Sequence, residues 1–152
     1  MRKLFRTLLI LPAFFVAVAA FAASEHGTAE DAKAMVKKAV AFYKANGKEK
    51  TIAALNDPKG AFVDRDIYVS VYDMNGVVLA YMQNAKLIGK DVSGLKDGDG
   101  KEFIKDILSQ SKAKGGGSTS YKWPHPVTKE LQGKTAYFEK VDDMVFSSGY
   151  YN

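Results

Sequence analysis

Residues 66–83, with the sequence DIYVSVYDMNGVVLAYMQ, decide the fold. Residues 67–73 alternate in character, which predicts a strand with two different faces. Asn75 and Gly76 both tolerate positive φ and close a tight hairpin, so residues 77–83 return as a second, antiparallel strand. The first strand carries aliphatic residues on one face and tyrosines with a serine on the other: Ile67, Val69 and Val71 against Tyr68, Ser70 and Tyr72.

The segment before this hairpin predicts a long amphipathic helix. Thr28 can cap its start, with Asp31 as a weaker form of the capping box, and Asn46-Gly47 supplies the stop. A second short helix over residues 49–55 ends at Asn56-Asp57-Pro58. Along the first helix, apolar residues recur at steps of three and four: Ala32, Met35, Val36, Ala39, Val40 and Tyr43.

The segment after the hairpin predicts one more helix and three more strands. Residues 87–94 should be irregular, and Asp99 should begin a helix with Glu102 completing an Asp-x-x-Glu box. Gly115-Gly116-Gly117 ends that helix. Strands are expected over residues 118–123, 134–141 and 144–151. These elements predict an α+β domain with an antiparallel sheet of about five strands, whose faces the helices cover.

The first 22 residues have the pattern of a secretory signal peptide. Arg2, Lys3 and Arg6 form a basic start, residues 8–21 are apolar and uncharged, and Ala20-Phe21-Ala22 has small residues where a signal peptidase reads them. We predict cleavage after Ala22, which leaves one domain over residues 23–152 in the periplasm. The alternative is an uncleaved anchor, although the apolar run is shorter than the roughly 20 residues of a membrane span.

Composition excludes several classes of function. The chain has no cysteine, so disulfides, thiolate catalysis and thiolate metal sites are absent. Its formal net charge is +5, and three of its positive charges lie in the predicted signal peptide. The remaining charges are of mixed sign, without the concentrated basic face that nucleic acid requires. We expect no nucleic-acid partner and no cofactor.

Motifs of enzymatic or metal chemistry are weak. Of the two histidines, His26 lies in a polar leader that we expect to be mobile, and His125 lies between two prolines on an expected solvated loop. Asp97-Gly98-Asp99-Gly100 suggests calcium, but an EF-hand loop opening at Asp97 would place Lys101 and Leu108 at oxygen-ligand positions. We therefore interpret that run as a turn and a helix cap, and we predict no metal site.

Aromatic residues give a stronger signal. Seven of the eight tyrosines and the single tryptophan fall in predicted strands. Tyr68, Tyr81, Tyr121 and Trp123 could present their rings to one cavity with apolar walls and a few aimed donors, which suits a small polar ligand. Ordinary sheet packing is the alternative, because tyrosine favours strands.

A series of short motifs runs through nearly all of the predicted mature chain. They are residues 54–62 (ALNDPKGAF), 66–73 (DIYVSVYD), 75–76 (NG), 87–91 (LIGKD), 96–103 (KDGDGKEF), 121–126 (YKWPHP), 134–137 (KTAY) and 148–151 (SGYY). In this order, the series resembles the single Cache domain of type 2. The resemblance implies a PAS-like antiparallel sheet with a long N-terminal helix, and extracytoplasmic sensing of small molecules, often short carboxylates, in bacterial receptors.

The resemblance also implies site residues. Tyr68 matches the strand tyrosine ahead of the hairpin, Tyr121 and Trp123 match a Tyr-x-Trp pair, and Lys134 matches the lysine that opens the next strand. Lys134 would then supply a buried positive charge to a C2–C4 carboxylate, with hydrogen bonds from Tyr68 and Tyr121. The alternative is that Lys134 only solvates the start of its strand. By parity, Lys134 shares a strand face with Ala136 and Phe138 rather than with Tyr137.

These observations predict a non-enzymatic binding domain for a small molecule. The chain ends just after the last predicted strand, so we expect a stand-alone periplasmic protein that passes its state to a separate membrane receptor or transporter. It would contact the membrane itself only if the signal segment stayed uncleaved, as an anchored sensory subunit. Two other classes stay open: a small enzyme with Tyr121 and Lys134 as acid and base, and a protein-interaction module with an exposed apolar patch.

Overall fold

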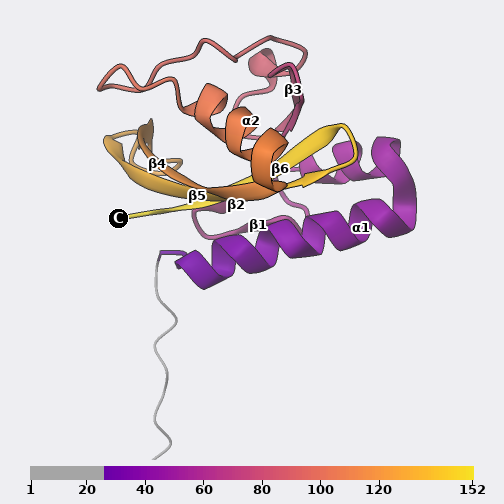
Figure 1. Cartoon of the computed structure of the whole chain (residues 1–152). Helices are drawn as coiled ribbons and strands as arrows, with labels where there is room; N and C mark the ends of the chain where they lie inside the picture. Colours follow the sequence, from indigo (N-terminus) through magenta and orange to yellow (C-terminus); the bar gives the residue numbers. More distant parts are fainter. Residues whose placement is uncertain (1–25) are drawn as a thin grey trace, which may run out of the picture.

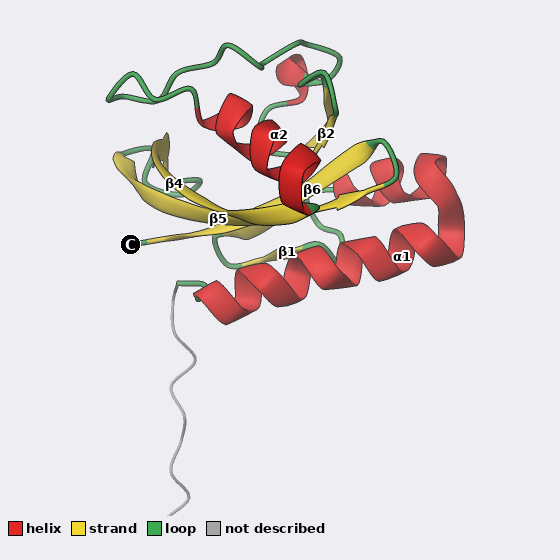
Figure 2. Cartoon of the chain, viewed as in Figure 1, coloured by secondary structure: helices red, strands yellow, loops and turns green. Residues whose placement is uncertain are grey.

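A central antiparallel sheet separates two layers of the molecule (Figures 1 and 2). The long helix α1 (Ala29–Leu55) lies on one face, and the shorter helix α2 (Phe103–Lys114) with the segment before it lies on the other. The computed structural model describes residues 26–152. The predicted signal peptide, its cleavage after Ala22 and the alternative anchor lie outside these residues.

The sheet has six strands, where we expected about five. They are β1 (Val63–Asp64), β2 (Ile67–Asp73), β3 (Val78–Tyr81), β4 (Gly116–Pro124), β5 (Leu131–Val141) and β6 (Met144–Tyr151). The order is β1-β2-β6-β5-β4, with β3 also pairing β2, and every pair is antiparallel. The additional strand is β1, which is only two residues long.

The two faces of the sheet bury different cores, as the alternation in β2 predicted. Val69 and Val71 pack toward α1, whereas Tyr68 and Tyr72 pack toward α2. Each fully buried aliphatic or phenylalanine side chain stabilises the fold by about 1.5–3 kcal/mol. The α1 side is mostly aliphatic with phenylalanine and also holds Tyr43 and Tyr137, while the α2 side gathers more of the tyrosines: Tyr68, Tyr72, Tyr81 and Tyr121.

Helix α1 has the ends that the sequence predicted. Thr28 and Asp31 form a reciprocal capping box. Gly47 leaves helical geometry at φ +78°, which breaks α1 where the Asn46-Gly47 stop was expected. Asn56 caps the C-terminus, and its side-chain Oδ1 accepts a hydrogen bond from the backbone N–H of Tyr81 at 2.9 Å. The end of α1 therefore fixes the position of β3.

Several predicted boundaries were wrong: β4 begins at Gly116 rather than at residue 118, and β5 begins at Leu131 rather than at residue 134. For the return strand and for α2, a side chain explains the difference. The return strand stops at Tyr81 rather than at residue 83, because the N–H of Tyr81 bonds to Asn56 and a turn leads into the short 3₁₀ helix η1 (Ala85–Leu87). Helix α2 begins at Phe103 rather than at Asp99. Asp97 accepts the N–H groups of Asp99 and Lys101, which holds this run as a turn.

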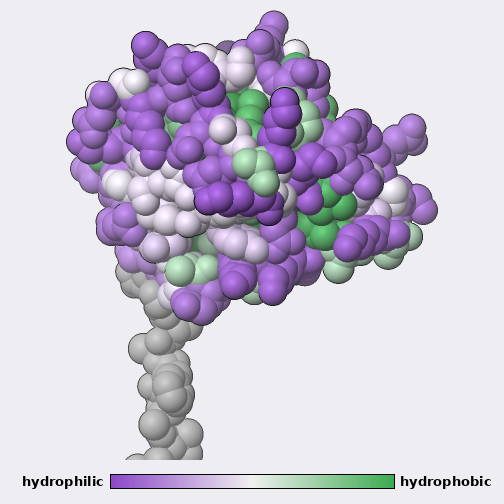
Figure 3. Space-filling model, in the orientation of Figure 1, coloured by the Kyte–Doolittle hydropathy of each residue, from purple (hydrophilic) through white to green (hydrophobic). Residues whose placement is uncertain are grey.

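Within residues 26–152, no helix combines the length and the apolar character that a membrane crossing requires. The face of the molecule shown in Figure 3 is largely hydrophilic, and apolar residues reach its surface in small separate areas. Among the described residues, the large hydrophobic side chains that are exposed are Ile88, Val127 and Leu131.

Candidate functional site

An inner cavity lies between the sheet and the α2 layer. All five residues that we predicted as a binding site line this cavity: Tyr68, Tyr81, Tyr121, Trp123 and Lys134. The centre of a water molecule can move through about 20 Å³ of this cavity, which is room for one water. The other lining residues are Ser70, Tyr72, Val78, Leu87, Val92, Leu95, Phe103 and Ile104.

Lys134 lies at the centre of the polar contacts in this cavity. Lys134 is 3% exposed, although it is only the fourth residue of β5. The Nζ atom donates hydrogen bonds to the Tyr68 hydroxyl at 2.7 Å and to the Tyr151 hydroxyl at 3.4 Å. The same Nζ lies 4.0 Å from the centroid of the Tyr68 ring and 4.7 Å from that of Tyr151. Two tyrosines therefore take the place of water around this ammonium.

Burial lowers the pKa of Lys134 to about 7, and the attraction of the more distant Asp66 offsets only part of that effect. No ion pair joins Lys134 to a carboxylate anywhere in residues 26–152. Neutral hydroxyl groups compensate a buried charge less well than a carboxylate does. The inner cavity thus contains a cationic group without an anionic partner in contact.

Gly149 makes room for the lysine. It lies on β6 opposite Ala136, and a Cβ at this position would come within 2.7 Å of the Lys134 Cε and 2.9 Å of the Thr135 carbonyl oxygen. A real Cβ atom almost never approaches other atoms so closely. The stem of Lys134 can therefore run under β6 only because residue 149 has no side chain.

The tyrosines of the cavity are neutral hydrogen-bonding groups. Burial, followed by the charge of neighbouring tyrosines, raises the pKa of Tyr68 and of Tyr121 well above the usual value of 10.0. Burial also raises the pKa of Tyr72 to about 12. The Tyr121 ring stacks on Phe103 with centroids 4.1 Å apart, so α2 holds this side chain from the apolar side. Such hydroxyl groups keep their protons at neutral pH and can donate to an anion.

An outer cavity of about 190 Å³ adjoins the inner one. The two share four lining residues: Tyr68, Tyr81, Leu87 and Trp123. The outer cavity is more polar toward solvent, where it is lined by Gln83, Asn84, Pro124, His125, Pro126 and Lys129. A small solute can therefore reach the shared aromatic side chains from the side of the β4–β5 loop.

Sequence reasoning missed several residues of the site. Ser70 and Tyr72 share the strand face of Tyr68, so parity alone could have added them to the cavity. The pairing register of β5 and β6 places Tyr151 and Gly149 beside Lys134. No local sequence pattern predicts that register. The parity argument itself is confirmed, because Lys134, Ala136 and Phe138 are buried on one face of β5.

Two expectations about the histidines were wrong. His125 is 3% exposed rather than solvated, because its ring packs against Tyr151 at 4.7 Å and contacts the buried carboxylate of Asp66. The leader is anchored where the structure describes it, since the Gly27 N–H donates to Asp66 Oδ1 at 2.7 Å and His26 also contacts Asp66.

Comparison with known proteins agrees with this architecture. The family model described as Single Cache domain 2 matches residues 8–151. The methyl-accepting chemotaxis protein McpP of Pseudomonas putida is 28% identical over 90 residues, which are 58% of this chain and 16% of that receptor. The chain thus spans about a sixth of the length of this curated relative.

Solved structures show the same fold. A methyl-accepting chemotaxis protein from Vibrio parahaemolyticus superposes with a TM-score of 0.70 at 22% identity, covering 80% of this chain and 86% of that one. A periplasmic sensor domain of a chemotaxis protein gives 0.64 at 24%, covering 80% and 88%. A Cache chemosensory domain studied for carboxylic acid recognition gives 0.63 at 24%, covering 80% and 86%.

Proposed function

This chain belongs to the Single Cache domain 2 family, and we propose that it is a non-enzymatic sensor domain that binds a small anion, a C2–C4 carboxylate, in the inner cavity. The buried ammonium of Lys134 carries this proposal. It is surrounded by tyrosines, and no described carboxylate pairs with it. A carboxylate at this position would gain charge-assisted hydrogen bonds, each stabilising by about 1.5–3 kcal/mol.

The other lining residues suit the same ligand. The Tyr68 and Tyr121 hydroxyl groups can donate to the carboxylate oxygens, while Phe103 and Trp123 offer apolar surface to a short alkyl chain. The inner cavity holds about one water, so the ligand must be small and neighbouring side chains must move to admit it. The solved Cache domain studied for carboxylic acid recognition supports the choice of ligand class.

An enzyme that used tyrosine and lysine as acid and base is the weaker alternative. Lys134 does lie within hydrogen-bond reach of a tyrosine, Tyr68. Acid–base catalysis also needs a partner that exchanges protons with substrate and solvent, and Lys134 is 3% exposed. Burial raises the pKa of both neighbouring tyrosines, Tyr68 and Tyr151, so neither acts readily as a base. Binding of a carboxylate, by contrast, requires only the positive charge of Lys134 and the hydrogen-bond donors around it.

We place the protein in the periplasm, with the signal peptide removed after Ala22. Ligand binding would then be communicated to a separate membrane receptor or transporter. Chemotaxis receptors among the relatives support a receptor as the partner class. Cell fractionation with an antibody to the native protein tests the location: protein of mature size in the periplasmic fraction supports the proposal, and full-length protein in the inner membrane contradicts it.

A thermal-shift screen of the purified protein tests the ligand class. The panel should pair C2–C4 carboxylates with amines of matched size and with urea. A compound present at 100 times its dissociation constant adds about 2.7 kcal/mol of stability. We expect shifts from carboxylates alone. A rise in melting temperature with amines or urea alone would contradict an anion site. A separate activity assay tests the absence of catalysis: turnover of a carboxylate by the wild type that is lost in Lys134→Ala would contradict a binding-only function.

A further inference from the structure

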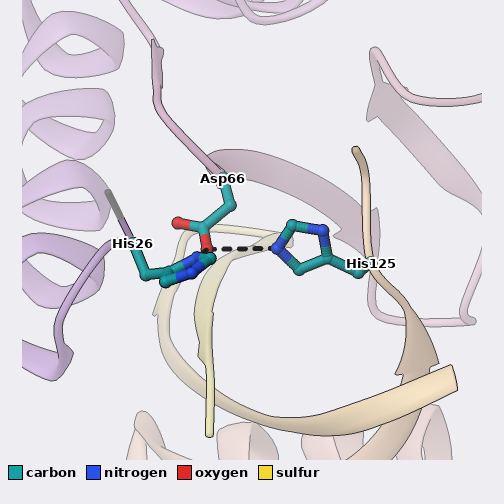
Figure 4. A group of neighbouring side chains, drawn as sticks. All are labelled: His26, Asp66 and His125. Atoms are coloured by element: carbon teal, nitrogen blue, oxygen red, sulfur yellow. Dashed lines mark hydrogen bonds and ion pairs between the residues drawn. The ribbon is translucent and has the colours of Figure 1, made fainter. Parts of the chain in front are cut away.

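A second group of polar side chains includes His125, which also lines the outer cavity. His26 precedes α1, Asp66 lies between β1 and β2, and His125 follows directly on β4. Figure 4 shows both imidazole rings beside the carboxylate of Asp66, the two side chains reaching it from different parts of the chain. Two imidazoles and one carboxylate are ligands that divalent transition metals prefer.

The spacing of these atoms fits a metal centre. Asp66 Oδ2 lies 3.2 Å from His26 Nδ1 and 3.3 Å from His125 Nε2. Tetrahedral zinc with bonds of 2.0–2.1 Å separates its ligand atoms by about 3.3 Å. The ligand atoms of all three residues lie within 4.8 Å of one another. The side chain of His26 is 65% exposed. Its movement alone can bring all three ligand atoms to the separation that zinc requires.

Two of the three side chains are buried, and one of these is a carboxylate. The side chains of Asp66 and His125 are 2% and 3% exposed. Burial acts to raise the pKa of Asp66, but hydrogen bonds from the Gly27 N–H, His26 and His125 outweigh it and lower that pKa. An ionised carboxylate is therefore held in place by the Gly27 amide, with its second oxygen facing both rings.

We propose that His26, Asp66 and His125 bind one divalent transition-metal ion of the zinc class. A water molecule would supply the fourth ligand. This inference does not depend on the proposed carboxylate site. It departs from our expectation, drawn from the sequence, that the protein has no metal site.

Metal binding at His125 requires a change of tautomer. In the structure, His125 Nδ1 accepts the backbone N–H groups of Val127 and Thr128, both at 3.3 Å, so Nε2 carries the ring proton and donates it toward Asp66. A metal takes the Nε2 lone pair, and the proton passes to Nδ1. The two long backbone hydrogen bonds are then lost, and the turn after His125 rearranges.

Titration of the purified protein, free of any polyhistidine tag, tests the proposal. Isothermal titration calorimetry with ZnCl₂ should show one ion per chain, and Co²⁺ should give the visible absorption of a four-coordinate site. We expect His26→Ala, Asp66→Asn and His125→Ala each to weaken zinc binding at least tenfold. Asp64→Asn is the matched control for Asp66→Asn, since Asp64 is a 51% exposed carboxylate two residues away; it should bind zinc as the wild type does.

The tautomer provides a readout independent of affinity. Zinc should move the imidazole ¹⁵N signals of His125 from the Nε2–H to the Nδ1–H form, and the amide signals of Val127 and Thr128 should shift with them. Zinc that binds equally well to His26→Ala, or that leaves the His125 ring signals unchanged, would overturn the proposal and show a hydrogen-bonded cluster only. His26→Ala changes an exposed side chain, so failure to fold does not obscure this comparison.

Discussion

Trp123 Nε1 donates a hydrogen bond to the Tyr81 hydroxyl over 3.0 Å, and both side chains line the inner as well as the outer cavity. The pair joins β4 to β3 across the α2 side of the sheet. The backbone of Tyr81 is itself held by Asn56 at the end of α1. We infer that a ligand moving from the outer to the inner cavity must displace this pair.

Tyr81→Phe should therefore speed ligand entry. The substitution keeps the ring and removes the hydroxyl that accepts from Trp123, so the two rings separate more easily. We expect a loss of about 1 kcal/mol in the free energy of unfolding and a several-fold rise in the association rate of acetate, measured by stopped-flow Trp123 fluorescence. Tyr43→Phe is the control, because its hydroxyl bonds to Asp142 on the α1 side. Equal association rates in wild type and Tyr81→Phe would contradict a barrier at this pair.

Acetate affinity should depend on pH through Lys134. Its pKa of about 7 in the free protein means that the ammonium is present below pH 7 and is lost above it. Affinity should thus be nearly constant between pH 5.5 and about 6.5, and should fall by about tenfold per pH unit above pH 7, with uptake of a proton on binding. Calorimetry in buffers of different ionisation enthalpy measures that proton. Affinity that rises with pH would contradict a charged lysine as the anion partner.

Gly149→Ala should disturb the site by a steric clash alone, because alanine adds a methyl group without a charge or a hydrogen-bonding atom. The new Cβ would meet the stem of Lys134 and the Thr135 carbonyl oxygen, so the lysine must move and β5 and β6 must part slightly. We expect destabilisation of about 1–3 kcal/mol, as for overpacking, and at least a tenfold loss of acetate affinity. Gly133→Ala is the matched control, because the nearest atom to its Cβ is Asn152 Nδ2 at 3.5 Å. Both properties are measured by chemical denaturation and calorimetry.

Lys134→Met should stabilise the free protein. The unfolded chain keeps the lysine proton up to its ordinary pKa of 10.5, whereas the folded protein gives it up near 7. Wild-type stability should therefore rise between pH 7 and 10.5, and burial of the charge costs on the order of a few kcal/mol below pH 7. The variant should lack this rise and should be more stable than wild type at pH 6, as urea denaturation would show. If Lys134→Met had a lower free energy of unfolding than the wild type at pH 6, a destabilising buried charge at Lys134 would be contradicted.

The sequence predicted the fold well because its signals are local. The capping box at Thr28, the stop at Gly47 and the hairpin at Asn75-Gly76 each act within a few residues, and the structure confirms all three. The alternation in β2 placed Tyr68 and Tyr72 on one face correctly. The limits of β3 and α2 were less predictable, because distant or neighbouring side chains, Asn56 and Asp97, compete for backbone N–H groups there.

The site was only partly predictable, because it depends on pairing between distant strands. Lys134 meets Tyr68 across 66 positions in the sequence, and its contact with Tyr151 follows from the β5–β6 register. His125 was predicted to be solvated because it lies on an expected loop, yet its buried ring contacts Asp66, which is 59 positions away in the sequence. Such contacts leave no periodic pattern in the chain.

Calorimetric titration of acetate and propionate into Lys134→Met tests the central claim most directly. Lys140→Met is the control, because it removes the same charge from an exposed position on the same strand. At pH 6 we expect wild type and Lys140→Met to bind the carboxylate with equal affinity, and Lys134→Met to lose at least tenfold in affinity, as removal of a hydrogen bond of about 1.5–3 kcal/mol implies. Carboxylate binding to Lys134→Met with wild-type affinity would contradict the account.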